Sequence, residues 1–157
     1  MLEEKEKYMQ NALKEAKKAY LEKEIPVGAI IVKDGIIIAK AHNIKEKKQD
    51  TTCHAEILAI QKASKKLSTW RLEGCQMYVT LEPCSMCAGA LINSRIQKVY
   101  IGTRDEKTGA CGSVLNLLTD YPFNHKVDYE FGILQKECEM MLKNFFQELR
   151  KEKKNVK

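Results

Sequence analysis

The segment IPVGAIIVKDGIIIAKAHN, residues 25–43, contains two nearly continuous apolar runs that meet at Asp34-Gly35. An Asp-Gly pair between two such runs is typical of a tight β-hairpin. Strands this apolar are expected where helices cover both faces of a sheet. The segment therefore predicts two adjacent antiparallel strands inside a layered α/β fold.

The remaining sequence alternates between helical and strand patterns. Apolar residues at helical spacing predict helices over 4–22, 50–64, 85–94 and 134–149. Short apolar runs predict further strands at 75–81, 97–102 and 126–131. Thr51 or Thr52 is the expected N-cap of the second helix. This order of elements predicts an α/β fold, a three-layer α/β/α sandwich with a mixed five-stranded sheet.

Length and composition limit the class of protein. The 157 residues match one ordinary domain, so we expect a single domain over 1–157. With 44% hydrophobic and 31% charged residues, the chain is not expected to be disordered as a whole. No apolar run approaches the ~18 residues that span a bilayer, and the start, MLEEKEKYMQ, lacks the apolar core of a secretory signal. We therefore expect a cytoplasmic protein with no membrane partner.

The net charge of +6 is unevenly distributed. A basic C-terminal helix and tail begins at about residue 143, where 143–157 hold six basic and two acidic side chains. Such a segment either neutralises phosphates of a nucleic acid or is simply a solvated helix end.

Two short motifs carry the chemistry: His54-Ala55-Glu56 and Pro83-Cys84-Ser85-Met86-Cys87. An imidazole and two thiolates three residues apart form a zinc-binding donor set, and a cytosolic chain seldom uses such a cysteine pair as a disulfide. A structural zinc site normally has four protein ligands, whereas a catalytic site leaves one position for water. Because no fourth ligand stands at a fixed spacing, we predict an open zinc site of His54, Cys84 and Cys87.

Glu56 is the predicted proton carrier of this site. Zinc would lower the pKa of a water molecule, and Glu56 would take its proton and pass it to the substrate ring and the leaving group. Residues two apart lie roughly 200° apart around a helix. His54 and Glu56 therefore reach one site only if the helix starts beside them.

The H-x-E and P-C-x-x-C motifs resemble those of the cytidine deaminase-like superfamily. The likeness runs nearly end to end, through PVGAIIV, HNIKEKKQDTTCHAEILAI and YVTLEPCSMCAGALINSRI. The segments RDEKTGACGS and GILQKECEMMLKNFF are similar to those of the bacterial tRNA adenosine deaminases, the TadA type, within that superfamily.

This resemblance implies a zinc-dependent hydrolase that converts the wobble adenosine of a tRNA anticodon loop to inosine, a tRNA-editing activity. Water replaces the amine at C6 of adenine, and ammonia leaves. The family pattern implies one zinc per subunit on His54, Cys84 and Cys87, with Glu56 as proton shuttle and Asn43 on the target nucleoside. It also implies a homodimer, and tRNA rather than DNA as the nucleic acid partner.

Further RNA contacts follow from the resemblance with less support from the residue types themselves. They fall on Arg104, Asp105, Lys107, Phe146 and Arg150. The alternative for the first three is a solvated loop with a local ion pair, and the alternative for the aromatic residue is a core position in the C-terminal helix. Cys53 stands where the family has alanine. We expect a small buried side chain there, the alternative being an oxidation-sensitive thiol close to the zinc.

Two other functions share parts of this pattern. A deaminase of a free nucleobase such as guanine or cytosine would have the same zinc ligands, Glu56 and fold. A non-catalytic RNA-binding module could keep zinc only for folding, but folding does not require Glu56. Activity on a tRNA stem-loop compared with free bases distinguishes these alternatives.

Overall fold

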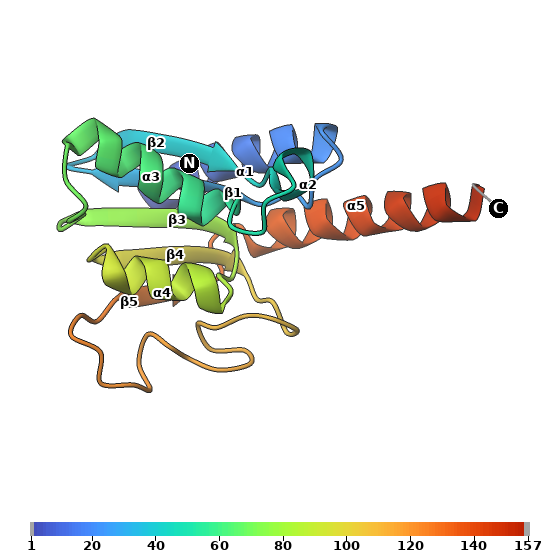
Figure 1. The fold of residues 1–157 in the computed structure, drawn as a ribbon. Coiled ribbons are helices and arrows are strands. Elements are labelled where there is room, and N and C mark those ends of the chain that lie inside the picture. The colour runs from blue at the N-terminus through green and yellow to red at the C-terminus, as the bar shows by residue number, and fades with distance from the viewer. Residues whose placement is uncertain (1, 156–157) are drawn as a thin grey trace.

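A mixed five-stranded sheet lies between two layers of helices in the computed structural model, which describes residues 2–155 (Figure 1). The strands are β1 (Gly28–Lys33), β2 (Ile36–His42), β3 (Cys75–Leu81), β4 (Lys98–Thr103) and β5 (Asp128–Phe131). Their order in the sheet is β2-β1-β3-β4-β5. β1 is antiparallel to both of its neighbours, whereas β3, β4 and β5 are parallel. The predicted α/β/α sandwich with a mixed sheet is confirmed.

Two pairs of helices cover the two faces of the sheet (Figure 1). α3 (Ala55–Leu67) and α4 (Ser85–Asn93) lie on one face, and α1 (Glu4–Leu21) and α5 (Gln135–Asn155) lie on the other. A short helix, α2 (Lys45–Lys48), precedes α3. α5 extends well past the sheet, and the last two residues of the basic segment 143–157 lie outside the described residues. No helix in residues 2–155 is long and apolar enough to cross a membrane.

The predicted hairpin turn is present between β1 and β2. Asp34 and Gly35 both have positive φ, 51° and 76°. Two consecutive residues with positive φ form the turn that matches the twist of paired strands, and Gly and Asp tolerate this conformation best. The Tyr8 hydroxyl also donates a hydrogen bond of 2.9 Å to the Gly35 carbonyl, which attaches α1 to the turn.

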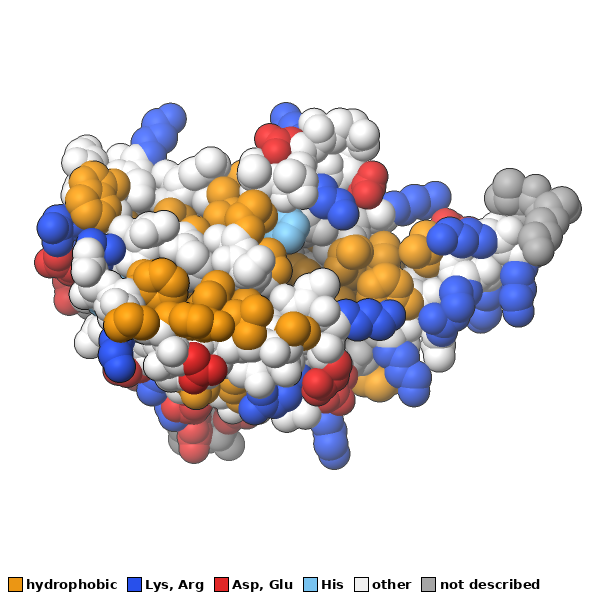
Figure 2. All heavy atoms as spheres, turned by 60° about the horizontal axis from the view of Figure 1, so that its bottom comes forward, with side chains coloured by type: hydrophobic (Ala, Val, Ile, Leu, Met, Phe, Trp, Pro, Cys, Tyr) orange, Lys and Arg blue, Asp and Glu red, His pale blue; other side chains and the backbone are white. Residues whose placement is uncertain are grey.

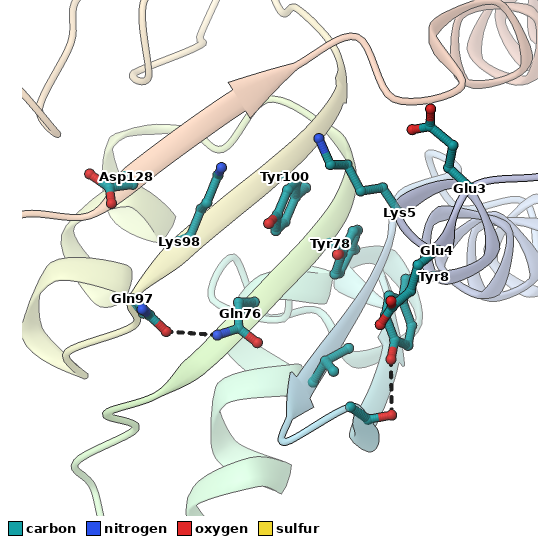
Figure 3. A pocket seen from close by; sticks show the side chains of 12 residues that line it. Glu3, Glu4, Lys5, Tyr8, Gln76, Tyr78, Gln97, Lys98, Tyr100 and Asp128 are labelled. Carbon is teal, nitrogen blue, oxygen red and sulfur yellow. Dashed lines mark hydrogen bonds between the residues drawn. The ribbon is translucent and has the colours of Figure 1, made fainter.

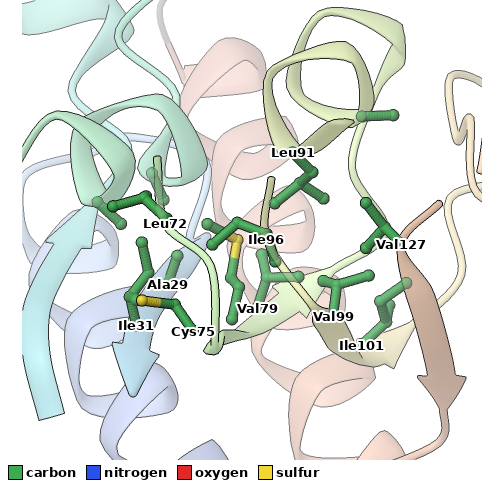
Figure 4. Close-up of a cluster of buried hydrophobic side chains, with 14 of the residues drawn as sticks. Ala29, Ile31, Leu72, Cys75, Val79, Leu91, Ile96, Val99, Ile101 and Val127 are labelled. Carbon is green, nitrogen blue, oxygen red and sulfur yellow. The ribbon is translucent and has the colours of Figure 1, made fainter. Parts of the chain in front are cut away.

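Alternate side chains of β1 enter different cores. Ala29 and Ile31 pack under α3 and α4, and Ile30 and Val32 pack under α1. Figure 4 shows the larger cluster, in which the side chains of β1, β3 and β4 meet those of α4. Helices α3 and α1 cover the two faces of both β1 and β2, as predicted from the apolar runs, although β2 is less deeply buried than β1. β2 is an edge strand, and its first residue, Ile36, is 64% exposed.

The second predicted helix starts later than the sequence suggests. α3 begins at Ala55, and its N-cap is His54, so the expected N-cap at Thr51 or Thr52 is wrong. The Asp50 carboxylate accepts hydrogen bonds from both the backbone amide and the hydroxyl of Thr52. Because this local turn uses the Thr52 hydroxyl as a donor, that hydroxyl does not cap the helix.

Candidate active site

The starts of α3 and α4 meet at one edge of the sheet and bring the two motifs together. His54 is the N-cap of α3, Cys84 is the N-cap of α4, and Cys87 lies in the first turn of α4. The His54 Nδ1 lies 3.7 Å from the Cys84 Sγ and 3.6 Å from the Cys87 Sγ. In the part of the chain that the structure describes, these residues form the one group of three side chains with metal-ligand geometry, with donor atoms within 4.8 Å of one another.

The three donor groups shift each other's pKa. Hydrogen bonding to Cys87, and then to His54, lowers the pKa of the Cys84 thiol to about 4 despite partial burial. Hydrogen bonding to Cys84 and burial raise the pKa of the Cys87 thiol. Hydrogen bonding to Cys84 raises the pKa of His54. The amides at the two helix starts add positive potential, which favours a thiolate at this place.

Glu56 lies in the first turn of α3, beside this cluster. It is only 4% exposed, and burial raises the pKa of its carboxyl group to about 7. Glu56, His54 and Cys84 line the same pocket. The expectation that His54 and Glu56 share a site only at the beginning of a helix is therefore met by this geometry.

The pocket has a volume of about 270 Å³. Apolar and polar side chains from the loops and helix starts at this place line it together. They are Ile25, Val27, Asn43, Lys45, His54, Ala55, Glu56, Leu81, Glu82, Cys84, Asp105 and Thr108. Asn43 is buried, and its amide nitrogen donates to the Ile25 carbonyl at 3.2 Å while its side-chain oxygen accepts from the Lys45 amide at 3.1 Å. An amide nitrogen has two hydrogens, so Asn43 retains a donor for a ligand.

The other predicted site residues lie at different places. Asp105 lines the pocket, whereas Lys107 is exposed on the same loop. The Arg104 guanidinium packs over the Phe131 ring at 4.0 Å from its centroid. Phe146, 38% exposed, and Arg150 lie on α5, along which Figure 2 shows a row of Lys and Arg side chains. The structure brings Asp105 to the pocket, whereas no α5 residue lines it.

A second hollow, of about 520 Å³, lies on the opposite face of the sheet (Figure 3). Tyr8, Tyr78 and Tyr100 line it, and the rings of Tyr78 and Tyr100 stack with centroids 4.4 Å apart. Lys5 and Lys98 lie along its rim, and none of its lining residues is a cysteine or a histidine. Although larger, this hollow lacks the donor groups and the buried acid of the pocket at the helix starts.

Several pocket residues have no signal of their own in the sequence. Ile25, Lys45, Thr108 and Glu82 all line the pocket without belonging to the two predicted motifs. Glu82 is the partial exception, because it directly precedes Pro83 and Cys84 and is a charged residue at the end of an apolar strand. That position could have marked it as a buried polar group of the site.

The remaining cysteines and histidines lie outside the metal-binding group. Cys75, Cys111 and Cys138 are buried, but Cys53 is only half-buried, so its expected buried position is wrong. The His125 Nε2 lies 2.7 Å from the Ile96 carbonyl, a structural contact. His42 lies between the carboxylates of Glu15 and Glu22, at 3.5 and 3.3 Å.

Comparisons with known proteins give a consistent result. Residues 3–150 match the family model of the MafB19-like deaminases. The chain is 53% identical over 149 residues to a tRNA-specific adenosine deaminase of Bacillus subtilis (strain 168), which covers 95% of this chain and 92% of that protein. It is 51% identical over 146 residues to a tRNA-specific adenosine deaminase of Aquifex aeolicus (strain VF5), covering 93% and 96% of the two chains.

Solved structures share the fold. A structure from a study of A-to-I editing by tRNA:A34 deaminases at the wobble position of transfer RNA superposes with a TM-score of 0.84 at 39% identity, covering 87% of this chain and 99% of that chain. A guanine deaminase from Nitrosomonas europaea superposes with a TM-score of 0.75 at 24% identity, covering 89% and 83% of the two chains. The second likeness concerns the fold alone.

Proposed function

Because the chain belongs to the MafB19-like deaminase family, we propose that it is a zinc-dependent hydrolase that deaminates the wobble adenosine of a tRNA anticodon loop to inosine. The observation that carries this proposal is the pocket lined by His54, Cys84 and the buried Glu56, with Cys87 completing the group of three metal-ligand side chains. Relatives named tRNA-specific adenosine deaminase, similar over nearly the whole chain, support tRNA as the substrate.

The donor set fits zinc. Zn–N and Zn–S bonds of about 2.0 and 2.3 Å at a tetrahedral angle separate the nitrogen and sulfur ligands by about 3.6 Å. The His54 Nδ1 lies 3.7 and 3.6 Å from the two sulfur atoms. Three protein ligands leave a fourth position, as catalytic zinc sites do, and zinc bound there would make a water molecule a better nucleophile.

The chain's own residues supply proton transfer and orientation. The Glu56 carboxylate takes one proton from water and delivers it to the adenine ring nitrogen. It then takes the proton of the new C6 hydroxyl and delivers it to the amine, which leaves as ammonia while C6 becomes a carbonyl. Its burial beside the cluster keeps it in contact with the reacting atoms and away from bulk solvent. Asn43 holds the nucleoside through its remaining amide hydrogen, and its own position is fixed by Ile25 and Lys45.

The size of the pocket favours a single base turned out of its strand. About 270 Å³ is too small for a folded RNA element but suits one base. An adenosine in an anticodon loop is already unpaired, so turning it into the pocket costs less free energy than opening a helix. The rest of the stem-loop then lies outside the pocket, where Arg104, Lys107, Phe146 and Arg150 are candidates for contact.

The experiment that tests this function uses the purified, zinc-loaded protein and an arginine-tRNA anticodon stem-loop with adenosine at the wobble position. Nuclease digestion and mass spectrometry score inosine, and free adenosine, cytosine and guanine serve as parallel substrates. Inosine in the stem-loop alone supports the proposal. Turnover of a free base with an untouched stem-loop contradicts it and favours nucleobase salvage.

The basic surface of α5 has its own test. Replacing Arg150 and Lys151 by glutamine is expected to weaken stem-loop binding and to reduce the slope of log K against log salt by roughly one per lost phosphate contact. Fluorescence anisotropy over a salt series measures the slope. An unchanged slope would place the RNA elsewhere.

Sedimentation of the same samples tests whether the protein is a homodimer, as we propose from its family.

A further inference from the structure

Glu82 is a buried carboxylate to which the proposed chemistry gives no role. It directly follows β3 and directly precedes Pro83 and Cys84, and it is only 3% exposed. It lines the pocket together with Asp105 and Thr108, which belong to the long loop after β4. A buried carboxylate is costly unless hydrogen bonds satisfy it, so its partners indicate what it does.

All four of its side-chain hydrogen bonds come from that loop. Oε1 accepts from the Asp105 amide at 3.1 Å and from the Ser113 hydroxyl at 2.5 Å. Oε2 accepts from the amides of Cys111 and Ser113 at 2.9 and 3.1 Å. An ionised carboxylate only accepts hydrogen bonds, which matches four donors. One side chain therefore gathers both ends of the segment 105–113.

The loop also closes tightly around the carboxylate. A Cβ on Gly109 would collide with the Glu82 carboxylate carbon and Oε2, so this position requires glycine. The Gly109 amide donates to the Asp105 carbonyl, and the Ala110 amide donates to the Pro83 carbonyl, each at 2.9 Å. Hydrogen bonds to Glu82 and to nearby carbonyl groups thus hold the backbone of the segment 105–113 around the Glu82 carboxylate.

This arrangement fixes the pocket wall. The Asp105 carboxylate accepts from the amides of Lys107 and Thr108 at 3.0 and 3.1 Å and from the Thr108 hydroxyl at 2.7 Å. Glu82 holds the Asp105 backbone, and Asp105 in turn holds Thr108. The positions of both side chains at the pocket therefore depend on Glu82.

We propose that Glu82 is a positioning residue for substrate binding: it holds the 105–113 wall of the pocket in place and takes no part in bond making. The proposal rests on the proposed deaminase function for its kinetic prediction. The exchange rates of the loop amides test it independently of any activity.

The principal variant is Glu82→Gln, which keeps the shape but places an NH₂ group against backbone donors. We expect the KM for the stem-loop to rise about tenfold or more, with a smaller change in kcat and an unchanged zinc content. Hydrogen exchange at the amides of Asp105, Cys111 and Ser113 is expected to become about tenfold faster or more, whereas the amides of β3 and β4 keep their rates.

Ser113→Ala is the milder variant and serves if Glu82→Gln does not fold. It removes one donor to Glu82 and is expected to raise the KM in the same direction by a smaller factor, whereas Ser113→Thr, which keeps the hydroxyl, restores it. Ser94→Ala is the control, because it also removes a serine hydroxyl that donates a hydrogen bond, but this one donates to the Ala90 carbonyl at the end of α4. It is expected to leave the KM unchanged.

Two results would overturn the proposal. One is a wild-type KM together with wild-type exchange in the loop of Glu82→Gln or, if that variant does not fold, of Ser113→Ala. The other is a loss of kcat together with zinc, which would mean that Glu82 acts on Cys84 through Pro83 instead of on the loop. If the wild-type protein forms no inosine, the proposed function fails, while faster exchange in the variant still supports Glu82 as the centre of the loop.

Discussion

The two hollows of this protein lie on opposite faces of the same strands and differ in more than size. The hollow beside α1 has a volume of about 520 Å³, and the pocket at the starts of α3 and α4 has about 270 Å³. Tyrosines line the first together with Lys5 and Lys98, which both pair with Glu130, whereas His54, Cys84 and the buried Glu56 line the second. The candidate reactive site therefore lies where two helix starts meet, and not in the hollow with the larger volume.

The parallel pair β3 and β4 explains why the pocket lies at this edge. The chain leaves β3 into the start of α4, and it leaves β4 into the loop that wraps around Glu82. The carboxyl ends of parallel strands collect such connections, and ligands commonly bind there in open α/β sheets. The hollow on the other face adjoins a single helix start, that of α1 at Glu3 and Glu4, and no cysteine or histidine lines it.

The largest expected effect separates the two hollows by activity. Glu56→Gln is expected to lower kcat for inosine formation by about a thousandfold while zinc stays bound, because the variant keeps the three ligands but loses the proton carrier. Tyr100→Ala, in the opposite hollow, is expected to leave kcat/KM within about twofold. Kinetics on the stem-loop and metal analysis of both variants measure this. A zinc-loaded, active Glu56→Gln protein would remove Glu56 from the mechanism.

A smaller effect separates the faces by stability, on two adjacent residues of β4. Ile101 is fully buried under the α3–α4 layer, whereas Tyr100 is only partly buried on the other face. Ile101→Ala is expected to lower the free energy of unfolding by about 3 kcal/mol, since it leaves a cavity. Tyr100→Ala is expected to cost about 1–2 kcal/mol, because it removes a stacked ring from an open hollow. Urea denaturation measures both, and equal losses would mean that the second hollow is as closely packed as the core.

Most of the fold and the central site residues follow from local sequence signals. The pattern of apolar residues and the Asp34-Gly35 pair predict the hairpin and the strands on either side of it, because a hairpin depends on residues that are close in the sequence. The two motifs predict which residues meet at the helix starts, because zinc chemistry restricts both residue type and spacing.

The parts that could not be predicted depend on distant contacts. The Glu24 carboxylate accepts hydrogen bonds from the amides of Glu46 and Lys47, which orders α2 and helps to delay the start of α3. Glu82 likewise accepts hydrogen bonds from backbone amides of residues up to 31 positions away. The residues next to either glutamate in the sequence do not indicate its hydrogen-bond donors, since any loop with free backbone amides can supply them. The walls of the pocket were therefore less predictable than its chemistry.

The smallest expected effect concerns an ion pair at the rim of the open hollow. Glu130 lies 2.9 Å from the Lys5 ammonium and 3.4 Å from that of Lys98. Hydrogen bonding to Lys5 lowers the pKa of Glu130 below its ordinary value of 4.5, with Lys98 adding to the shift and burial opposing it. A carboxylate whose folded pKa is lowered stabilises the protein above its unfolded pKa, and this stabilisation is lost as the pH falls through the folded value.

Glu130→Gln is therefore expected to lower the free energy of unfolding slightly at pH 7, and by less as the pH falls below 4.5 toward pH 3 and Glu130 becomes protonated. The loss at pH 7 is expected to be smaller than that of Tyr100→Ala, because the pair is partly exposed and solvent screens it. Urea denaturation of both proteins at the two pH values provides the test, with Glu73→Gln, in the exposed pair with Arg71, as a control. A difference that does not shrink between pH 7 and pH 3 would show that packing of the side chain, and not its charge, joins α1 to the strands at this rim.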